Sequence, residues 1–201
     1  EGLDDPKDRG GYRGWSERLA QHIAASQEHD PEYANLAIRG RSTREVKDEQ
    51  LAPALALQPD FATLFVGTND VTAGRFDEAQ FTADFEEMQQ ALREAGASVL
   101  SFTLPDLSPV MPLARFVRGR VLRMNERIRE CSARTGSILV DFAAAPVTSD
   151  PRLWSDDRIH ANSEGHARMA AALAQAVGLP GHDAWEASLG AQARRSALAR
   201  A

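Results

Sequence analysis

Hydrophobic and polar residues alternate along the chain in two rhythms, one typical of amphipathic helices and one of buried strands. Trp15, Leu19 and Ile23 recur at helical spacing, whereas residues 61–66 (FATLFV) form an unbroken apolar run. Such a run is typical of a strand that is buried on both faces. The whole pattern predicts helices over residues 12–26, 43–57, 77–95, 113–134 and 163–177, and strands over residues 33–38, 61–66, 97–103 and 137–141.

Single residues refine the ends of these helices. Ser42 or Thr43 caps the second helix, and Pro53 kinks or ends it because proline removes a backbone donor. Gly96 ends the third helix, and Gly119 bends or breaks the fourth. Strands that alternate with helices predict an α/β fold with a parallel sheet covered on both faces.

Composition narrows the class of protein. The 201 residues suit one domain with a buried core, and the formal net charge of -6 argues against a nucleic-acid partner. The single cysteine, Cys131, excludes an intrachain disulfide and fits a reducing compartment, so we expect a cytoplasmic location. Apolar runs stay well short of the roughly 20 residues of a membrane-spanning helix. We expect one domain over residues 1–181, followed by a tail or peripheral helix over residues 182–201.

The sequence Gly67-Thr68-Asn69-Asp70 directly follows the predicted strand over residues 61–66. Functional sites in open α/β sheets gather at the carboxyl ends of strands. The neutral amide of Asn69 can donate a hydrogen bond to an oxyanion that develops in a reaction. The same residue types are also typical of a plain turn, which is the alternative explanation.

A second glycine, Gly40, follows the predicted strand over residues 33–38 and precedes a helix. Its backbone N–H can approach a bound oxygen without obstruction from a side chain. The alternative is that this glycine only shapes the turn.

The richest motif is Trp154-Ser155-Asp156-Asp157-Arg158-Ile159-His160, followed by a helix that contains His166. A carboxylate three residues before a histidine can fold back onto the Nδ1–H of the imidazole and leave Nε2 free as a base. Otherwise Asp157 would cap a turn and His160 would be a surface residue. His166 lies inside the predicted helix, where we expect it to pack or to face solvent.

Taken in order, the three motifs resemble the sequence blocks of SGNH, or GDSL-like, hydrolases. The resemblance covers about residues 1–178 and includes Tyr12-Arg13-Gly14-Trp15. It implies a three-layer α/β/α flavodoxin-like sandwich with a mainly parallel, five-stranded sheet. It also implies an oxyanion hole at Gly40 and Asn69, and a catalytic pair of Asp157 and His160.

The first block of this family, Gly-Asp-Ser-x-x-x-Gly, carries the nucleophilic serine at the end of the first strand. This sequence contains no Gly-Asp-Ser and begins Glu1-Gly2-Leu3-Asp4-Asp5, which resembles the tail of that block. We therefore expect the first strand and its serine to precede Glu1. In the strand order 2-1-3-4-5, that strand lies between residues 33–38 and 61–66. Without it, several buried backbone groups would stay unpaired, each at a cost of about 1–3 kcal/mol.

Ser42 and Ser163 are the nearest substitutes for the missing nucleophile, but Ser42 is better explained as the start of a helix and Ser163 as a helix N-cap. The function expected is hydrolysis of a small-molecule ester, without a cofactor or metal, since the five histidines lack ligand spacing. Two alternatives remain open: an acyltransferase with the same site, and a non-catalytic domain of this type that lacks the nucleophile.

Overall fold

The computed structural model describes residues 5–7, 11–28 and 31–190 of the chain. Its centre is a parallel sheet of β1 (Phe61–Leu64), β2 (Ser98–Phe102) and β3 (Ile138–Val140), in the order β1-β2-β3. Phe61 lies opposite Ser98, and Leu100 lies opposite Ile138. The predicted strands over residues 61–66, 97–103 and 137–141 are thus confirmed, each with slightly narrower bounds.

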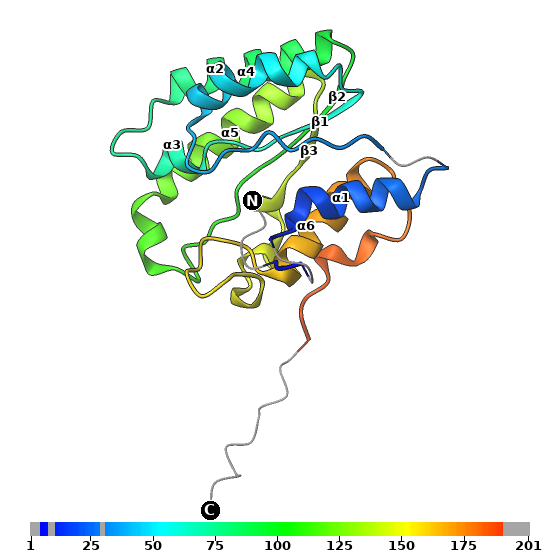
Figure 1. The fold of residues 1–201 in the computed structure, drawn as a ribbon. Helices are drawn as coiled ribbons and strands as arrows, with labels where there is room; N and C mark the ends of the chain where they lie inside the picture. The colour runs from blue at the N-terminus through cyan, green and yellow to red at the C-terminus, as the bar shows by residue number, and fades with distance from the viewer. Residues whose placement is uncertain (1–4, 8–10, 29–30, 191–201) are drawn as a thin grey trace, which may run out of the picture.

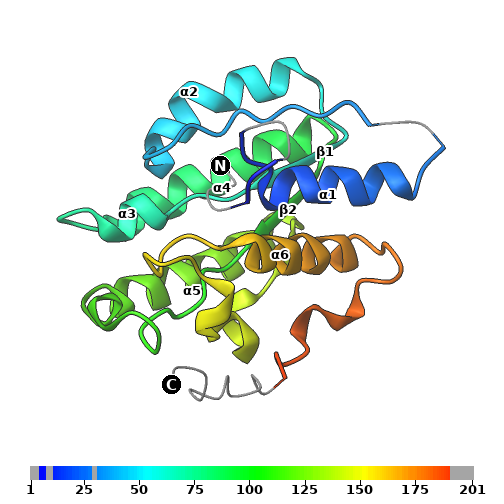
Figure 2. The same cartoon turned by 60° about the horizontal axis from the view of Figure 1, so that its bottom comes forward.

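Helices cover both faces of the sheet and make three layers (Figure 1). One face carries α1 (Gly14–Ala25) and α6 (Ser163–Ala176), which lie side by side (Figure 2). The other face carries α2 (Thr43–Ala56), α4 (Glu78–Glu94) and α5 (Arg118–Thr135). The short helix α3 (Thr68–Thr72) follows β1. Short 3-10 helices follow β2, β3 and α6: η1 (Pro112–Phe116), η2 (Phe142–Ala144), η3 (Pro146–Ser149), η4 (Pro151–Leu153) and η5 (Asp183–Glu186).

The alternation of side chains along β2 divides the core in two. Leu100 and Phe102 point to the face of α1 and α6, where they pack in a cluster with Leu173. Val99 points to the opposite face and packs in a cluster with Phe85 of α4. Because Val99, Leu100 and Phe102 are all buried, β2 contributes to both hydrophobic clusters.

The structure refines the predicted helices at three positions. The hydroxyl of Ser42 accepts the backbone N–H of Glu45, whose side chain bonds back to the N–H of Ser42, so Ser42 caps α2. Pro53 lies inside α2, which continues to Ala56. The break expected near Gly119 falls instead at Val117, where η1 gives way to α5.

Residues 33–38 correct the sequence prediction, because they are extended chain without strand pairing. Tyr33 is 46% exposed and Ile38 is 50% exposed, and the N–H of Ala37 bonds to the side chain of Asn35 instead of to a neighbouring strand. A strand requires a partner, and β1 does not supply one to this segment. Within the described residues the sheet has three strands rather than five, and the strand expected upstream of Glu1 stays a prediction.

Beyond α6 the chain folds back onto the domain. Trp185 of η5 is buried and belongs to the same cluster as Phe102 and Leu173. Residues 191–201, the greater part of the expected tail, lie outside the described residues. The described part of the chain contains no helix with the length and apolar character needed to cross a membrane.

Candidate active site

The loop between η4 and α6 brings Asp157 and His160 into direct contact. Nδ1 of His160 lies 2.7 Å from Oδ2 of Asp157. The other carboxylate oxygen, Oδ1, accepts the backbone N–H groups of Ile159 at 2.8 Å and His160 at 3.0 Å. The carboxylate therefore has one oxygen fixed by the loop backbone and one facing the imidazole.

The electrostatics of this pair favour an ionised aspartate. Partial burial acts to raise the pKa of Asp157, but hydrogen bonds from the imidazole, from two backbone N–H groups and from the Ser155 hydroxyl lower it more. The net effect holds the pKa of Asp157 well below its usual range. The His160 side chain is 37% exposed and that of Asp157 is 43% exposed, so solvent and substrate can reach them.

The loop that carries the pair is closed on itself. Trp154 and Ala161 form an antiparallel bridge, and the N–H of Ser155 donates to the carbonyl of His160 at 2.8 Å. Arg158 turns the chain between Asp157 and His160 with φ of 59°, a left-handed conformation that is uncommon outside glycine. Sequence reasoning predicted the contact between Asp157 and His160 but missed the closing role of Ser155.

Asn69 lies in α3, directly beyond β1. Its amide donates one N–H to the carbonyl of Arg41 at 2.9 Å. An amide NH₂ has two hydrogens, so the second N–H remains for another acceptor. Gly67 precedes α3 with φ of 108°, and a Cβ there would collide with the Met124 sulfur, so this turn requires glycine.

Gly40 and Asn69 belong to turns that are bonded together. Gly40 has φ of 81° and stands next to Arg41, which accepts the bond from Asn69. The carboxylate of Asp70, the residue after Asn69, accepts the N–H of buried Thr43 at 2.9 Å and the Thr43 hydroxyl at 3.0 Å. These contacts hold the turn that contains Gly40 against the turn that contains Asn69.

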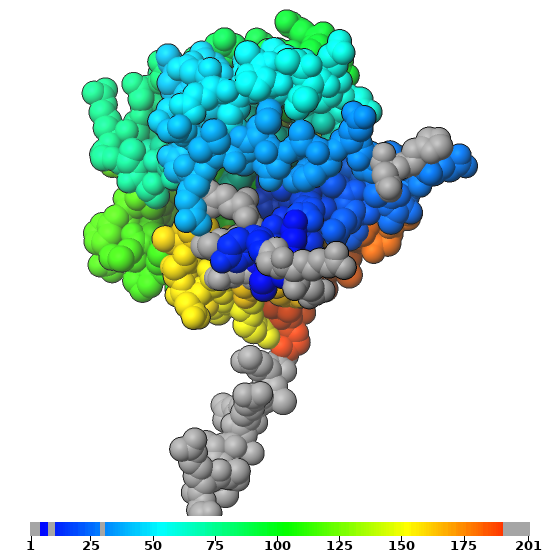
Figure 3. All heavy atoms as spheres, viewed as in Figure 1, coloured from blue at the N-terminus to red at the C-terminus, as the bar shows by residue number. Residues whose placement is uncertain are grey.

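The two candidate groups lie on the same side of the molecule. The start of α2, α3 and the loop before α6 all lie beyond the carboxyl ends of the strands, toward the left of Figure 1 and of Figure 2. The segment from residue 31 to residue 42 crosses the front surface between α1 and α2 (Figure 3). The sheet thus presents both groups at its carboxyl edge, where sites in such folds gather.

Both alternative serines are engaged in structural bonds. Ser42 caps α2, as expected. Asn162, rather than Ser163, caps α6 by accepting the N–H of Gly165, which corrects the sequence interpretation. Ser163 instead donates its hydroxyl to Asp5 at 2.9 Å.

His166 has a packing role, as its helical position predicts. It is only 7% exposed, and its Nδ1 accepts the backbone N–H of Trp15 at 3.2 Å.

A buried ion pair joins the first described residues to the start of α6. Asp5 is fully buried and accepts two bonds of 2.7 Å from Arg18, in addition to the bond from Ser163. The hydrogen bond from Arg18 holds the pKa of Asp5 well below its usual range, against the opposing effect of burial. The sequence pattern gave no signal for this cluster, because Asp5 and Ser163 lie far apart in the chain.

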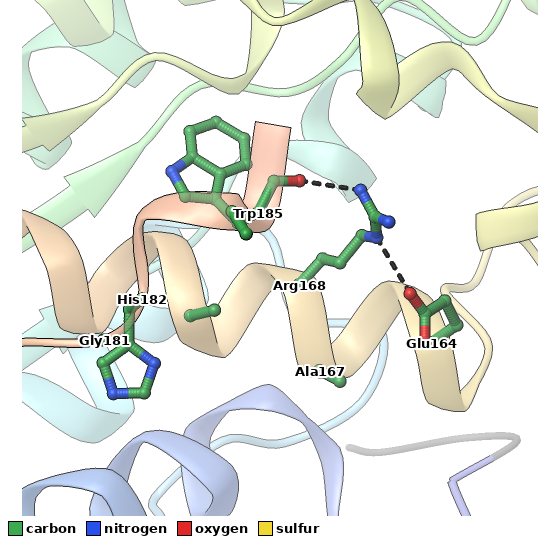
Figure 4. A pocket seen from close by; sticks show the side chains of 8 residues that line it. Glu164, Ala167, Arg168, Gly181, His182 and Trp185 are labelled. Carbon is green, nitrogen blue, oxygen red and sulfur yellow. Dashed lines mark hydrogen bonds and ion pairs between the residues drawn. The ribbon is translucent and has the colours of Figure 1, made fainter. Parts of the chain in front are cut away.

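A hollow outside the loop between η4 and α6 is lined in part by side chains that are already bonded to one another. This hollow of about 260 Å³ lies between α6 and η5 and is lined by Glu164, Arg168 and His182 among others (Figure 4). Arg168 is already bonded to Glu164 and to the carbonyls of Trp185 and Ala187. Among the residues that the structure describes, no cluster of three or more His, Cys, Asp or Glu side chains is placed to hold a metal ion.

Solved structures share this fold. An alpha/beta hydrolase from the metagenome of Lake Arreo, Spain, is 22% identical with a TM-score of 0.72, over 89% of this chain and 88% of that one. A catalytic mutant of an acetylxylan esterase from Geobacillus stearothermophilus is 18% identical with a TM-score of 0.72, over 84% and 82%. The psychrotrophic esterase EstA from Pseudoalteromonas sp. is 16% identical with a TM-score of 0.64, over 82% and 86%.

Fold and sequence together define the class, which is the SGNH-type α/β ester hydrolases. A model of the GDSL-like Lipase/Acylhydrolase family matches residues 1–168, so the chain belongs to this family. The family resemblance inferred from the three motifs is thereby confirmed, as is the class of enzyme, a carboxylic ester hydrolase. No curated protein matches the sequence.

Proposed function

We propose that this protein hydrolyses esters of small molecules through a Ser–His–Asp triad in which His160 is the general base and Asp157 its partner. The observation that carries the proposal is the 2.7 Å contact between Nδ1 of His160 and Oδ2 of Asp157. A carboxylate bonded to Nδ1–H fixes the tautomer that leaves Nε2 unprotonated. The ionised state of Asp157 also stabilises the imidazolium that forms when Nε2 accepts a proton.

The reaction takes place in two acyl-transfer steps. The serine oxygen bonds to the ester carbonyl carbon while its proton passes to Nε2 of His160, and that proton then leaves on the departing alcohol. Water attacks the resulting acyl-serine in the same way, which releases the carboxylic acid and restores the serine. In both steps a negative charge develops on the carbonyl oxygen.

Asn69 and Gly40 supply donors for that charge. The second N–H of the Asn69 amide is available because the first is anchored to Arg41. Gly40 carries no side chain that would screen its backbone N–H, and both residues belong to turns tied together by Asp70 and Thr43. Donors that are fixed before the reaction stabilise an oxyanion most effectively.

The nucleophile in this proposal is the serine of the family's first block, upstream of Glu1. Ser42 is committed to the cap of α2, and Ser163 to the buried cluster with Asp5 and Arg18. Both hydroxyls therefore already have structural partners, which supports a nucleophile from outside the printed sequence.

The test is covalent labelling of the full-length protein, including any residues that precede Glu1. A fluorophosphonate phosphonylates an activated serine and expels fluoride, and peptide mapping locates the modified residue. We expect the label outside residues 1–201, its loss in His160→Ala, and its retention in the control His166→Ala. Label on Ser42 or Ser163, or full labelling of His160→Ala, would contradict the proposed triad.

Product analysis separates hydrolysis from transfer by the same site. With a p-nitrophenyl ester and an added alcohol, a hydrolase releases the free carboxylic acid, whereas an acyltransferase forms the new ester. A protein that neither labels nor turns over any of these esters would be a non-catalytic domain.

A further inference from the structure

Ser155 lies between the acid and the base of the catalytic loop. Its Oγ is 2.9 Å from Oδ1 of Asp157 and 2.8 Å from the carbonyl oxygen of His160. The residue is only 7% exposed, so these contacts form with little competition from water. A hydroxyl has a single hydrogen to donate, which here is placed between two acceptors that both belong to the site.

The backbone of Ser155 reinforces this position. Its N–H donates to the carbonyl of His160 at 2.8 Å, and its carbonyl accepts the N–H of Arg158 at 3.0 Å. Ser155 thus contacts Asp157 through its side chain and His160 through its backbone N–H as well as its side chain. The imidazole and carboxylate are themselves more than a third exposed, so packing contributes little to their alignment.

We propose that Ser155 is a positioning residue, whose hydroxyl locks Asp157 in the orientation that presents Oδ2 to Nδ1 of His160. This inference rests on the proposed function, because it assigns the lock to the same Asp157–His160 pair. Oδ1 is held by the hydroxyl and by two backbone N–H groups, so the carboxylate keeps Oδ2 toward the imidazole. Rotation of the carboxylate would break the contact that selects the tautomer of His160.

The fold does not depend on the hydroxyl, which allows a clean test. In Ser155→Ala the His160 carbonyl still accepts the N–H of residue 155, and Oδ1 still accepts two backbone N–H groups. No buried acceptor is left without a donor, so the variant keeps the loop and loses one of the three hydrogen bonds that hold Oδ1.

The first measurement is the tautomer of His160 by ¹⁵N NMR, above the pH at which imidazole titrates. In the wild type we expect the hydrogen on Nδ1, whereas Ser155→Ala shifts the population toward the tautomer with hydrogen on Nε2. Ser155→Thr retains a hydroxyl and restores the wild-type ratio. Ser149→Ala is the matched control, since its hydroxyl bonds only to the carbonyl of Asp106.

The second measurement is the hydrolysis of p-nitrophenyl acetate by the full-length protein. Loss of one hydrogen bond to a charged group predicts a kcat roughly tenfold lower, with KM nearly unchanged and kcat restored in Ser155→Thr. If Ser155→Ala does not fold, Ser155→Cys, which carries a weaker donor, should give a kcat below that of the wild type and of Ser155→Thr.

The outcomes separate a failure of the positioning role of Ser155 from a failure of the proposed function. An unchanged tautomer ratio in Ser155→Ala overturns the positioning role, even where the wild type is an active esterase. An inactive wild type with a shifted tautomer ratio in Ser155→Ala overturns the proposed function and leaves the lock in place.

Discussion

The Nδ1 atom of His160 and the Oδ2 atom of Asp157 lie 2.7 Å apart, and only two residues separate His160 from Asp157 in the chain. A single loop between η4 and α6 therefore builds both members of the pair. Two N–H groups of that loop, those of Ile159 and His160, also hold the other carboxylate oxygen. The Asp157–His160 pair is thus a local structure, held by contacts within one loop.

Replacing Asp157 with asparagine should remove the tautomer control and leave the loop in place. An amide can present its NH₂ to Nδ1, which forces the hydrogen of the imidazole onto Nε2, the atom that must act as base. By analogy with other Ser–His–Asp enzymes, we expect kcat to fall by about 10⁴ with little change in KM. Asp156→Asn is the control, because it removes the same charge from an exposed neighbour. Steady-state kinetics with equal losses in both variants would show a general charge effect instead.

Asn69→Ala should affect the transition state far more than substrate binding. Loss of one oxyanion-hole donor typically lowers kcat by about 10²–10³. The turn should survive, because Asp70 still accepts two bonds from Thr43. Asn35→Ala, which changes an exposed asparagine, is the matched control for the kinetics. A raised KM with an unchanged kcat would identify Asn69 as a substrate-binding residue.

Gly67→Ala tests the turn that places Asn69. Its φ of 108° disfavours a side chain, and the added Cβ would meet the Met124 sulfur and the Phe81 ring. Overpacking of this kind costs about 1–3 kcal/mol, before any backbone strain is added. Thermal unfolding should show a Tm lower by several degrees, about 2–4 °C for each kcal/mol. Gly74→Ala has open space around the new Cβ and should leave Tm nearly unchanged, so equal shifts in the two variants would count against this explanation.

Local patterns in the sequence predicted the helices and three strands, because each depends on residues close together in the chain. The strand expected over residues 33–38 failed because strand formation needs a partner, and no local pattern reports which partner is present. The same contrast applies to the site. Asp157 and His160 were predictable from a spacing of three residues, whereas the contact of Asp5 with Ser163 joins residues 158 positions apart. Such a pairing becomes visible only when the fold brings α1 and α6 together.

The pair of Asp5 and Arg18 gives a prediction about stability. Asp5→Ala leaves the guanidinium of Arg18 without its two carboxylate bonds, with Ser163 as its remaining partner. Breaking a buried ion pair by removing one member costs about 3–5 kcal/mol. Chemical denaturation near neutral pH should therefore show Asp5→Ala to be destabilised by this amount, whereas the exposed control Asp156→Ala should be nearly neutral.

The loss in Asp5→Ala should depend on pH in a defined direction. The hydrogen bond from Arg18, opposed by burial, makes the folded-state pKa of Asp5 lower than the ordinary value of 3.8. The ionised carboxylate thus contributes stability that is complete above that ordinary value and is lost as the pH falls toward the folded-state pKa. Denaturation curves should give a constant difference between wild type and Asp5→Ala down to about pH 5, and a shrinking one below about pH 4. A difference that stays constant in acid would mean that Asp5 contributes through packing rather than through its charge.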